Sequence, residues 1–126
     1  MAIHESGEDY LETILVLSQE KGNVRSIDIA ADLGYSKPSV SRAMGILKNS
    51  GYITINDSGH ILLTEVGRAK AEQIYDRHRT ITRYFQEVLG VSLENARNDA
   101  CRIEHDLSEE TYQKLKEALK ANDKHK

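Results

Sequence analysis

The stretch SIDIAADLGYSKPSVSRAMGILKNSG, residues 26–51, carries two helix patterns separated by a short glycine turn. Ser26 is placed to cap a short helix that ends at Leu33. Ser36 is placed to cap a second helix, with Pro38 in its first turn, where a missing N–H group costs nothing. The stretch therefore predicts two helices joined by a tight turn.

A helix is predicted before this stretch and a β-hairpin after it. Residues 52–55 and 60–63 alternate apolar and polar side chains, and residues 56–59 read Asn-Asp-Ser-Gly, a hairpin turn. Residues 6–20 carry apolar side chains at helical spacing, namely Tyr10, Leu11, Ile14, Leu15 and Leu17. Helix, short helix, turn, helix and hairpin follow one another in the order of a winged helix-turn-helix.

The second half of the sequence predicts helices only. Thr64 begins a long helix that ends at Gly90, and two shorter helices are expected at about 93–104 and 108–119. The long helix has an inward stripe of Val66, Ala69, Ile74, Arg77, Ile81, Tyr84, Val88 and Leu89. The predicted fold is mainly α with a small β-hairpin wing.

Small polar and cationic side chains gather at the start of the second helix of the pair. Such side chains are what a helix needs when it enters the major groove of DNA by its N-terminus. Taken alone, this surface is better explained as an ordinary solvated helix face, but the complete element order favours DNA binding. The candidate DNA contacts are Arg25, Ser36, Lys37, Pro38, Ser39, Ser41 and Arg42.

Composition and charge are compatible with this interpretation. The 126 residues carry a net charge of −3, but residues 22–70 hold six Lys or Arg against four acidic residues. No apolar run approaches the ~20 residues of a membrane span, and the polar N-terminus is unlike a signal peptide. The single cysteine, Cys101, excludes an internal disulfide and suits a reducing compartment, so we expect a cytoplasmic protein without membrane association.

Several metal-capable side chains recur at helix-face spacing. Cys101, Glu104 and His105 stand at i, i+3 and i+4 of one predicted helix, and Asp9 and Glu12 at i and i+3 of another. Thiolate, carboxylate and imidazole together suit a divalent transition metal. The candidate metal ligands are Asp9, Glu12, His78, Cys101, Glu104 and His105.

Other interpretations of these residues stay open at this point. The thiol could be a small buried apolar group, the Glu–His pair a surface pair, and the first-helix acids a solvated face. A winged-helix regulator that senses a small ligand or an oxidant through Cys101, without metal, is one alternative. A metallohydrolase is a remote one, since no separate nucleophile or base accompanies the ligand set.

Three runs of sequence resemble the diphtheria-toxin-repressor and manganese-transport-regulator family: EDYLETI at 8–14, RHR at 77–79 and DACRIEHDLS at 99–108. The resemblance implies a winged helix-turn-helix DNA-binding domain at 1–64 and a helical metal-binding and dimerisation domain at 65–126. It further implies a homodimer on a double-stranded DNA operator, no enzymatic activity, and repression of metal-uptake genes with Fe²⁺ or Mn²⁺ as corepressor. We expect the short form, without the third domain of the longer iron regulators.

Position by position, the chain is similar to both branches of that family. Asp9 and Glu12 match carboxylate ligands of the manganese branch, whereas Cys101 matches a cysteine of the iron branch. Thr82 and Arg97 stand at two ancillary-site positions of the iron branch, and neither side chain is a useful ligand. Because sulfur is a softer ligand than oxygen, we expect Fe²⁺ to be preferred over Mn²⁺, with Zn²⁺ or Co²⁺ competent in vitro.

The resemblance also indicates how metal would act. Metal held by the first helix and the later helices would favour an arrangement in which two recognition helices meet successive major grooves, ~34 Å apart. Apolar residues of the later helices are candidates for the dimer interface, namely Val88, Leu89, Ile103 and Leu107.

Overall fold

The computed structural model describes residues 5–124, with side chains from residue 7 onward. Its contacts divide into two compact units, the first ending at Glu72 and the second beginning at Gln73. Among the described residues, no helix combines the length and the apolar composition that crossing a membrane requires.

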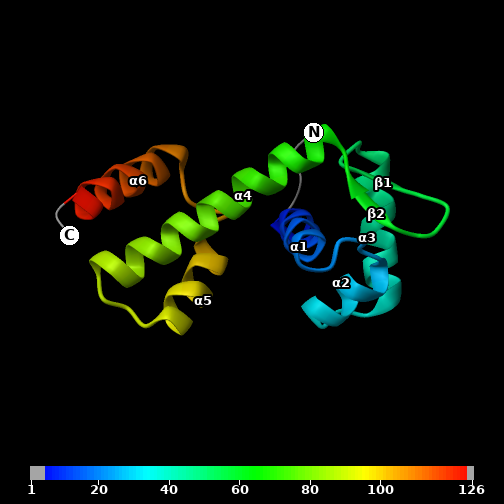
Figure 1. Ribbon diagram of the computed structural model, residues 1–126, viewed down its shortest axis with the longest axis horizontal. Coiled ribbons are helices and arrows are strands. Elements are labelled where there is room, and N and C mark those ends of the chain that lie inside the picture. Colours follow the sequence, from blue (N-terminus) through cyan, green and yellow to red (C-terminus); the bar gives the residue numbers. More distant parts are fainter. Residues whose placement is uncertain (1–4, 125–126) are drawn as a thin grey trace. The chain divides into compact units, whose positions relative to one another are not determined.

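The first unit is a winged helix-turn-helix, as the element order predicts (Figure 1). The β-strands pair antiparallel, with Ile53 opposite Leu63 and Ile55 opposite Ile61. Its elements are α1 (Glu5–Lys21), α2 (Ser26–Leu33), α3 (Lys37–Asn49), β1 (Ile53–Ile55), β2 (Ile61–Leu63) and the start of α4 (Glu65–Arg83). α2 contacts α1 and α3, and the hairpin contacts α1 and α3.

The sequence predicts the N-cap of α3 correctly but not that of α2. Ser36 is the N-cap of α3, and its Oγ accepts the backbone N–H of Ser39 at 3.3 Å. For α2 the N-cap is Arg25 rather than Ser26, because the Asp28 carboxylate accepts the backbone N–H of Arg25 at 2.9 Å. In a capping box, the acidic side chain at the third helical position accepts the backbone N–H of the N-cap residue.

The first turns of α4 pack on the first unit, with a face that differs from the predicted one. Val66 is 63% exposed and Ala69 is exposed, whereas Gly67 and Ala71 are buried. Thr64 is the residue that sets this face, because its hydroxyl donates to the carbonyl of Gly51 at 2.7 Å and accepts the N–H of Gly67. The predicted stripe is therefore wrong over the first turn. Because these turns pack on the first unit, the boundary between the two units falls inside α4, after Glu72 and not after residue 64.

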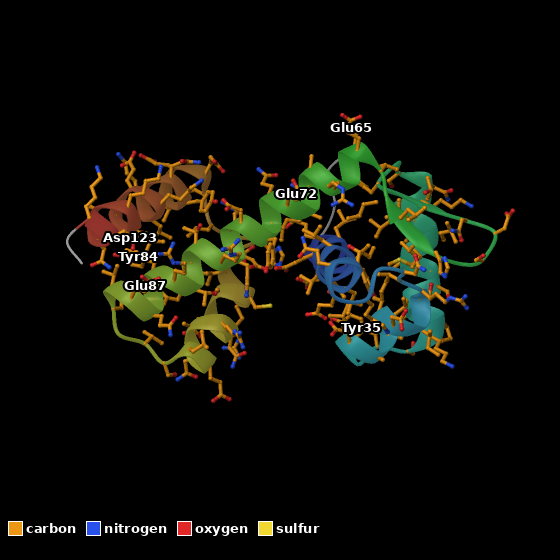
Figure 2. All side chains as sticks on the ribbon, viewed as in Figure 1. Tyr35, Glu65, Glu72, Tyr84, Glu87 and Asp123 are labelled. Carbon is orange, nitrogen blue, oxygen red and sulfur yellow. The ribbon has the colours of Figure 1, made fainter. Side chains whose placement is uncertain are left out.

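The second unit consists of the rest of α4 and three further elements. These are η1, a five-residue π-helical turn (Tyr84–Val88), α5 (Leu93–Ile103) and α6 (Glu109–Lys124). The single helix expected up to Gly90 thus ends in a π-helical turn after Arg83, whose guanidinium donates to Glu87 and Asp123 (labelled in Figure 2). Three apolar side chains of this region are exposed, namely Val88 at 38%, Leu89 at 59% and Leu93 at 43%, so the predicted inward stripe is also wrong at Val88 and Leu89.

Candidate functional site

Glu104 is a carboxylate at a position where the helix pattern calls for an apolar side chain. Ala96, Ala100 and Glu104 follow one another at intervals of four along α5 and its C-cap, and each is at most 1% exposed. The two alanines let α5 approach its neighbours closely, and the carboxylate continues the same buried line. Burying a carboxylate is costly unless other groups compensate its charge, so the groups around Glu104 indicate its role.

Two imidazoles flank this carboxylate. His78 Nδ1, from α4, lies 2.8 Å from Glu104 Oε2, the distance of a hydrogen bond in which the imidazole donates. His105 Nε2 lies 3.4 Å from Glu104 Oε1 without making a hydrogen bond. Over the residues that the structure describes, Glu104 Oε1 is one of only two buried side-chain polar atoms that lack a hydrogen-bond partner.

The donor set and the unpaired oxygen fit a divalent transition metal. A carboxylate oxygen and imidazole nitrogens are ligands that Fe²⁺, Mn²⁺ and Zn²⁺ accept in proteins. Buried polar atoms are nearly always paired, so an unpaired buried carboxylate oxygen calls for a cationic partner. The structure thus places two of the six candidate ligands, His78 and His105, against a third, Glu104.

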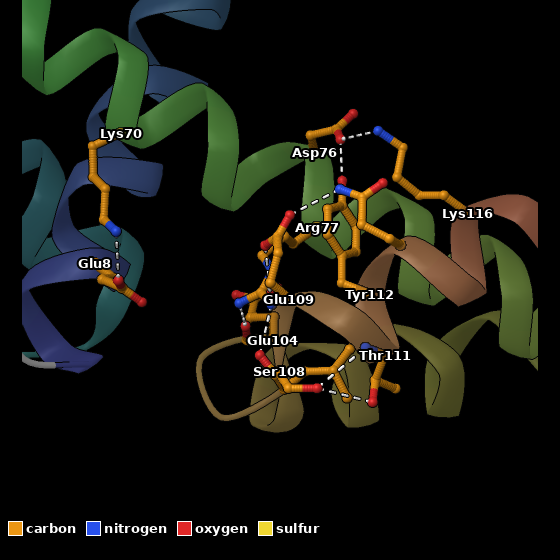
Figure 3. A network of polar contacts seen from close by, with 12 residues as sticks. Glu8, Lys70, Asp76, Arg77, Glu104, Ser108, Glu109, Thr111, Tyr112 and Lys116 are labelled. Atoms are coloured by element: carbon orange, nitrogen blue, oxygen red, sulfur yellow. Dashed lines mark hydrogen bonds and ion pairs between the residues drawn. The ribbon is translucent and has the colours of Figure 1, made fainter.

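The backbone around this cluster is held by Arg77, which precedes His78 on α4. Its Nη1 donates to the carbonyl of Glu104 at 2.8 Å, and its Nη2 donates to the carbonyl of Leu107 at 2.6 Å (Figure 3). α5 ends at Ile103, so Glu104 is its C-cap and His105 lies in the following turn. The sequence places Arg77 on the inward stripe of the long helix and indicates no function for it. Its only distinguishing feature in the sequence is a positive charge next to His78, a candidate ligand.

Cys101 lies on α5, directly after the buried Ala100. Its side chain is exposed, whereas Glu104 is buried. In the described part of the chain, Cys101 belongs to no group of three metal-capable side chains whose ligand atoms lie within 4.8 Å of one another. The backbone keeps helical hydrogen bonds past Ile103, since the N–H of Leu107 bonds to the carbonyl of Ile103 at 3.0 Å. The common face of Cys101, Glu104 and His105 and the ligand role of the thiol both stay predictions.

Both side chains at the two ancillary-site positions, Thr82 and Arg97, are described by the structure. Thr82 is buried, and its hydroxyl donates to the backbone carbonyl of His78 at 2.7 Å. Arg97 is exposed on α5.

Asp9 and Glu12 belong to the first unit. Both lie on α1, one turn apart, and both are half-buried beside the buried Tyr10, Leu11 and Thr13. Their neighbour Glu8 pairs with Lys70 of α4, Nζ to Oε2 at 3.3 Å (Figure 3). The participation of Asp9 and Glu12 in a metal site is a prediction from the sequence.

The predicted DNA-reading end of α3 is open to solvent. Ser36, Lys37, Pro38, Ser39, Ser41 and Arg42 are all exposed, and Val40, Met44 and Leu47 face inward. The hydroxyl of Ser36 donates to Ser39 Oγ at 2.8 Å, so this serine is engaged in capping. Lys37 and Arg42 supply the positive charge of the surface, as a nucleic-acid interface requires.

Arg25 lies against the wing beside the start of β2. Its Nη2 is 3.5 Å from His60 Nε2, and the neighbouring Val24 forms a β-bridge with Ile61. At the tip, Asn56 Oδ1 accepts the N–H groups of Ser58 and His60, so this side chain serves the turn. Arg25 therefore presents an exposed cation beside the hairpin, next to the DNA-reading helix pair.

Comparison with protein-family models matches nearly the whole chain. Residues 2–61 match the iron-dependent repressor N-terminal DNA-binding domain, and residues 64–125 match the iron-dependent repressor metal-binding and dimerisation domain. The two matches follow each other in the order of one repressor.

Individual relatives agree with these matches. The transcriptional regulator MntR of Escherichia coli O157:H7 is 41% identical over 104 residues, which cover 82% of this chain and 66% of that protein. An HTH-type transcriptional regulator of Methanocaldococcus jannaschii is 34% identical, with 89% and 90% covered. Among solved structures, IdeR of T. acidophilum superposes with a TM-score of 0.81 at 28% identity, covering 94% of this chain and 55% of that one.

The chain is shorter than most of these proteins. It spans just under two thirds of the E. coli regulator and about half of the solved IdeR chain. The two family models together nevertheless account for both of its units, and the regulator from M. jannaschii matches over almost its full length. The chain belongs to the iron-dependent repressor family of transcriptional regulators, the family that includes MntR and IdeR.

Proposed function

We propose that this protein is a metal-dependent, DNA-binding repressor of metal-uptake genes, with Fe²⁺ or Mn²⁺ as corepressor. It acts as a homodimer on a double-stranded DNA operator in the cytoplasm, and it is not an enzyme. One observation carries the proposal: a buried carboxylate, Glu104, lies against two imidazoles and has one oxygen without a hydrogen-bond partner.

The proposed site takes ligands from both halves of the chain. Glu104, His78 and His105 supply the cluster described above, and Asp9 and Glu12 of α1 complete it. A bound divalent cation supplies the positive charge that offsets these carboxylates. Without it the acids repel one another and protons compete for the imidazoles, so the affinity for metal rises with pH.

Helix α1 gives the metal site its influence on DNA binding. The same helix carries Asp9 and Glu12 and packs on α2 and β2 of the winged helix through Leu11, Ile14 and Leu15. Ligands on α1 therefore make the orientation of the winged helix depend on metal. A differential affinity of ~3–5 kcal/mol is enough to change the population of the DNA-competent arrangement substantially.

The second unit offers a surface for the proposed dimer. Val88, Leu89 and Leu93 are exposed apolar side chains within six residues of one another. Ile103 and Leu107, the other two predicted interface residues, are only half-buried in the single chain. This supports an interface on the second unit, in line with the dimerisation domain that the matching family model describes.

Cys101→Glu is expected to shift the metal response from Fe²⁺ toward Mn²⁺. We propose the thiol as a further ligand that reaches the site by rotation of its side chain, and a carboxylate in its place is a harder donor. Anaerobic titrations of operator binding with each metal measure the change. Cys101→Ser serves as the control for loss of sulfur alone, and unchanged selectivity in the Glu variant would contradict a ligand role for Cys101.

Arg42→Ala is expected to weaken operator binding roughly tenfold to a hundredfold and to leave metal affinity unchanged. Arg42 is exposed on the DNA-reading end of α3. DNA-binding anisotropy and metal calorimetry on the same preparation give the two numbers. Equal loss of both would show that Arg42 is a folding residue instead.

Because the operator is not known, selection from a random DNA library tests the proposed function. The protein is used with Mn²⁺ in one arm and with a chelator in the other. We expect a two-fold symmetric sequence to be enriched only with metal. Equal enrichment in the chelator arm would favour a metal-independent regulator, and no enrichment in either arm would rule out sequence-specific DNA binding.

A further inference from the structure

We infer that Arg77 is a positioning residue for the metal cluster, one that fixes the turn from Glu104 to Leu107 and thereby presents Glu104 and His105. The inference rests on the proposed metal function and deepens it. It concerns a side chain that is itself no metal ligand, since a guanidinium offers donors only.

The geometry of the contact is the first argument. Carbonyls at the end of a helix have no partner within the helix; Glu104 is the C-cap of α5, and Leu107 lies in the turn that follows. Arg77 supplies one N–H donor to each, Nη1 at 2.8 Å and Nη2 at 2.6 Å. A planar fork that binds two carbonyls on either side of His105 fixes the backbone that carries both ligands.

The position of Arg77 on α4 is the second argument. Ile74 and Ile81, one turn away on either side of it, are buried, and the Arg77 side chain is itself only 15% exposed. An apolar side chain would fill this place without desolvating a charge, and buried ionic groups are often neutral or unfavourable for stability. Arg77 also leaves its Nε buried without a partner. The stability of the fold therefore does not by itself explain why residue 77 is an arginine.

The third argument is that the guanidinium is itself held in place. It lies over the ring of Tyr112 of α6, 5.1 Å from the ring centroid, a cation–π distance. The hydroxyl of Tyr112 donates to Asp76, and Lys116 Nζ lies 3.5 Å from the same carboxylate (Figure 3). α6 thus supports the ring on which Arg77 rests, and the turn is tied to two helices through one side chain.

Arg77→Gln tests the inference, with Arg83→Gln as its matched control. Both replace an arginine of α4, but Arg83 contacts Glu87 and Asp123 and not the turn. In the metal-free protein we expect amide hydrogen exchange at Asp106 and Leu107, which bond to the carbonyl of Ile103, to speed up roughly tenfold in Arg77→Gln only. Exchange as slow as in the wild type would overturn the inference.

Metal binding supplies the second readout. We expect Mn²⁺ affinity to fall roughly tenfold in Arg77→Gln with unchanged stoichiometry, and the visible absorption of bound Co²⁺ to change, which a purely structural loss would not produce. Arg77→Lys, which retains the charge but offers a single donor atom, is expected to recover the affinity only in part. Unaltered affinity and spectrum in folded Arg77→Gln, the same loss in Arg83→Gln, or full recovery with Lys would each contradict the inference.

The two readouts also separate this inference from the proposed function. If the wild type bound no divalent metal, the proposed function would fail. Hydrogen exchange on the metal-free protein would still decide whether Arg77 holds the turn.

Discussion

Glu104→Gln is expected to abolish metal-dependent operator binding while leaving the protein folded. Glutamine has the same shape, but it removes the buried negative charge that lies between His78 and His105. Since losing an outer partner of a metal ligand already costs 10–100-fold in affinity, we expect the loss of this central ligand to exceed roughly a hundredfold. Calorimetry with Mn²⁺ and operator binding by anisotropy measure the two effects.

Stability distinguishes this loss from simple unfolding. Oε1 of Glu104 is buried without a hydrogen-bond partner, so the metal-free wild type bears the cost of an incompletely compensated charge. We therefore expect metal-free Glu104→Gln to unfold at the same temperature as the wild type or higher. Glu117→Gln, at an exposed position of α6, is the matched control and should change neither property. Metal-dependent operator binding that survives in Glu104→Gln would contradict the role given to this carboxylate.

Gly67→Ala is expected to destabilise the winged-helix unit by about 3 kcal/mol, with a fall in Tm on the order of 10 °C or more. A Cβ at residue 67 would lie 1.9 Å from the carbonyl oxygen of Tyr52 and 2.8 Å from its carbonyl carbon. Both are backbone atoms, and the oxygen also accepts the N–H of Thr64 at 3.0 Å. The methyl group can fit only if α4 moves away from the end of α3 and the start of β1.

Gly45→Ala is the matched control for this effect. Gly45 lies inside α3, and a Cβ there meets no atom within 4 Å. Because alanine favours a helix over glycine, we expect it to be neutral or to stabilise the protein by roughly 0.5–1 kcal/mol. Thermal unfolding of both variants measures the contrast. Equal stability of Gly67→Ala and the wild type would show that α4 does not pack as closely on Tyr52 as described.

The winged helix was predictable because local signals decide it. The serine cap and the proline of α3, the period-two strands and the Asn-Asp-Ser-Gly turn each act within a few residues, and the structure has all of them. The first turn of α4 was not predictable in this way. Its buried face is set by the Thr64 hydroxyl on Gly51, a contact between residues 13 apart in sequence.

The candidate site was predictable in part. Helix spacing and family resemblance named His78, Glu104 and His105, which the structure brings together. The exposure of Cys101 was not predictable, because residue spacing along α5 does not say which side of the helix its neighbours cover. Arg77 was missed because its partners are backbone carbonyls nearly thirty residues away, and no side-chain pattern in the sequence reports such a contact.

The most direct test of metal-dependent DNA binding is a fluorescence anisotropy titration of the selected operator with the wild-type protein under anaerobic conditions. Parallel samples contain Fe²⁺, Mn²⁺, Zn²⁺ or a chelator, at one fixed salt concentration because affinity for DNA depends on salt. We predict tight binding with Fe²⁺ and Mn²⁺, tighter with Fe²⁺, and binding at least roughly a hundredfold weaker with chelator. Equal affinity with and without metal would contradict the account.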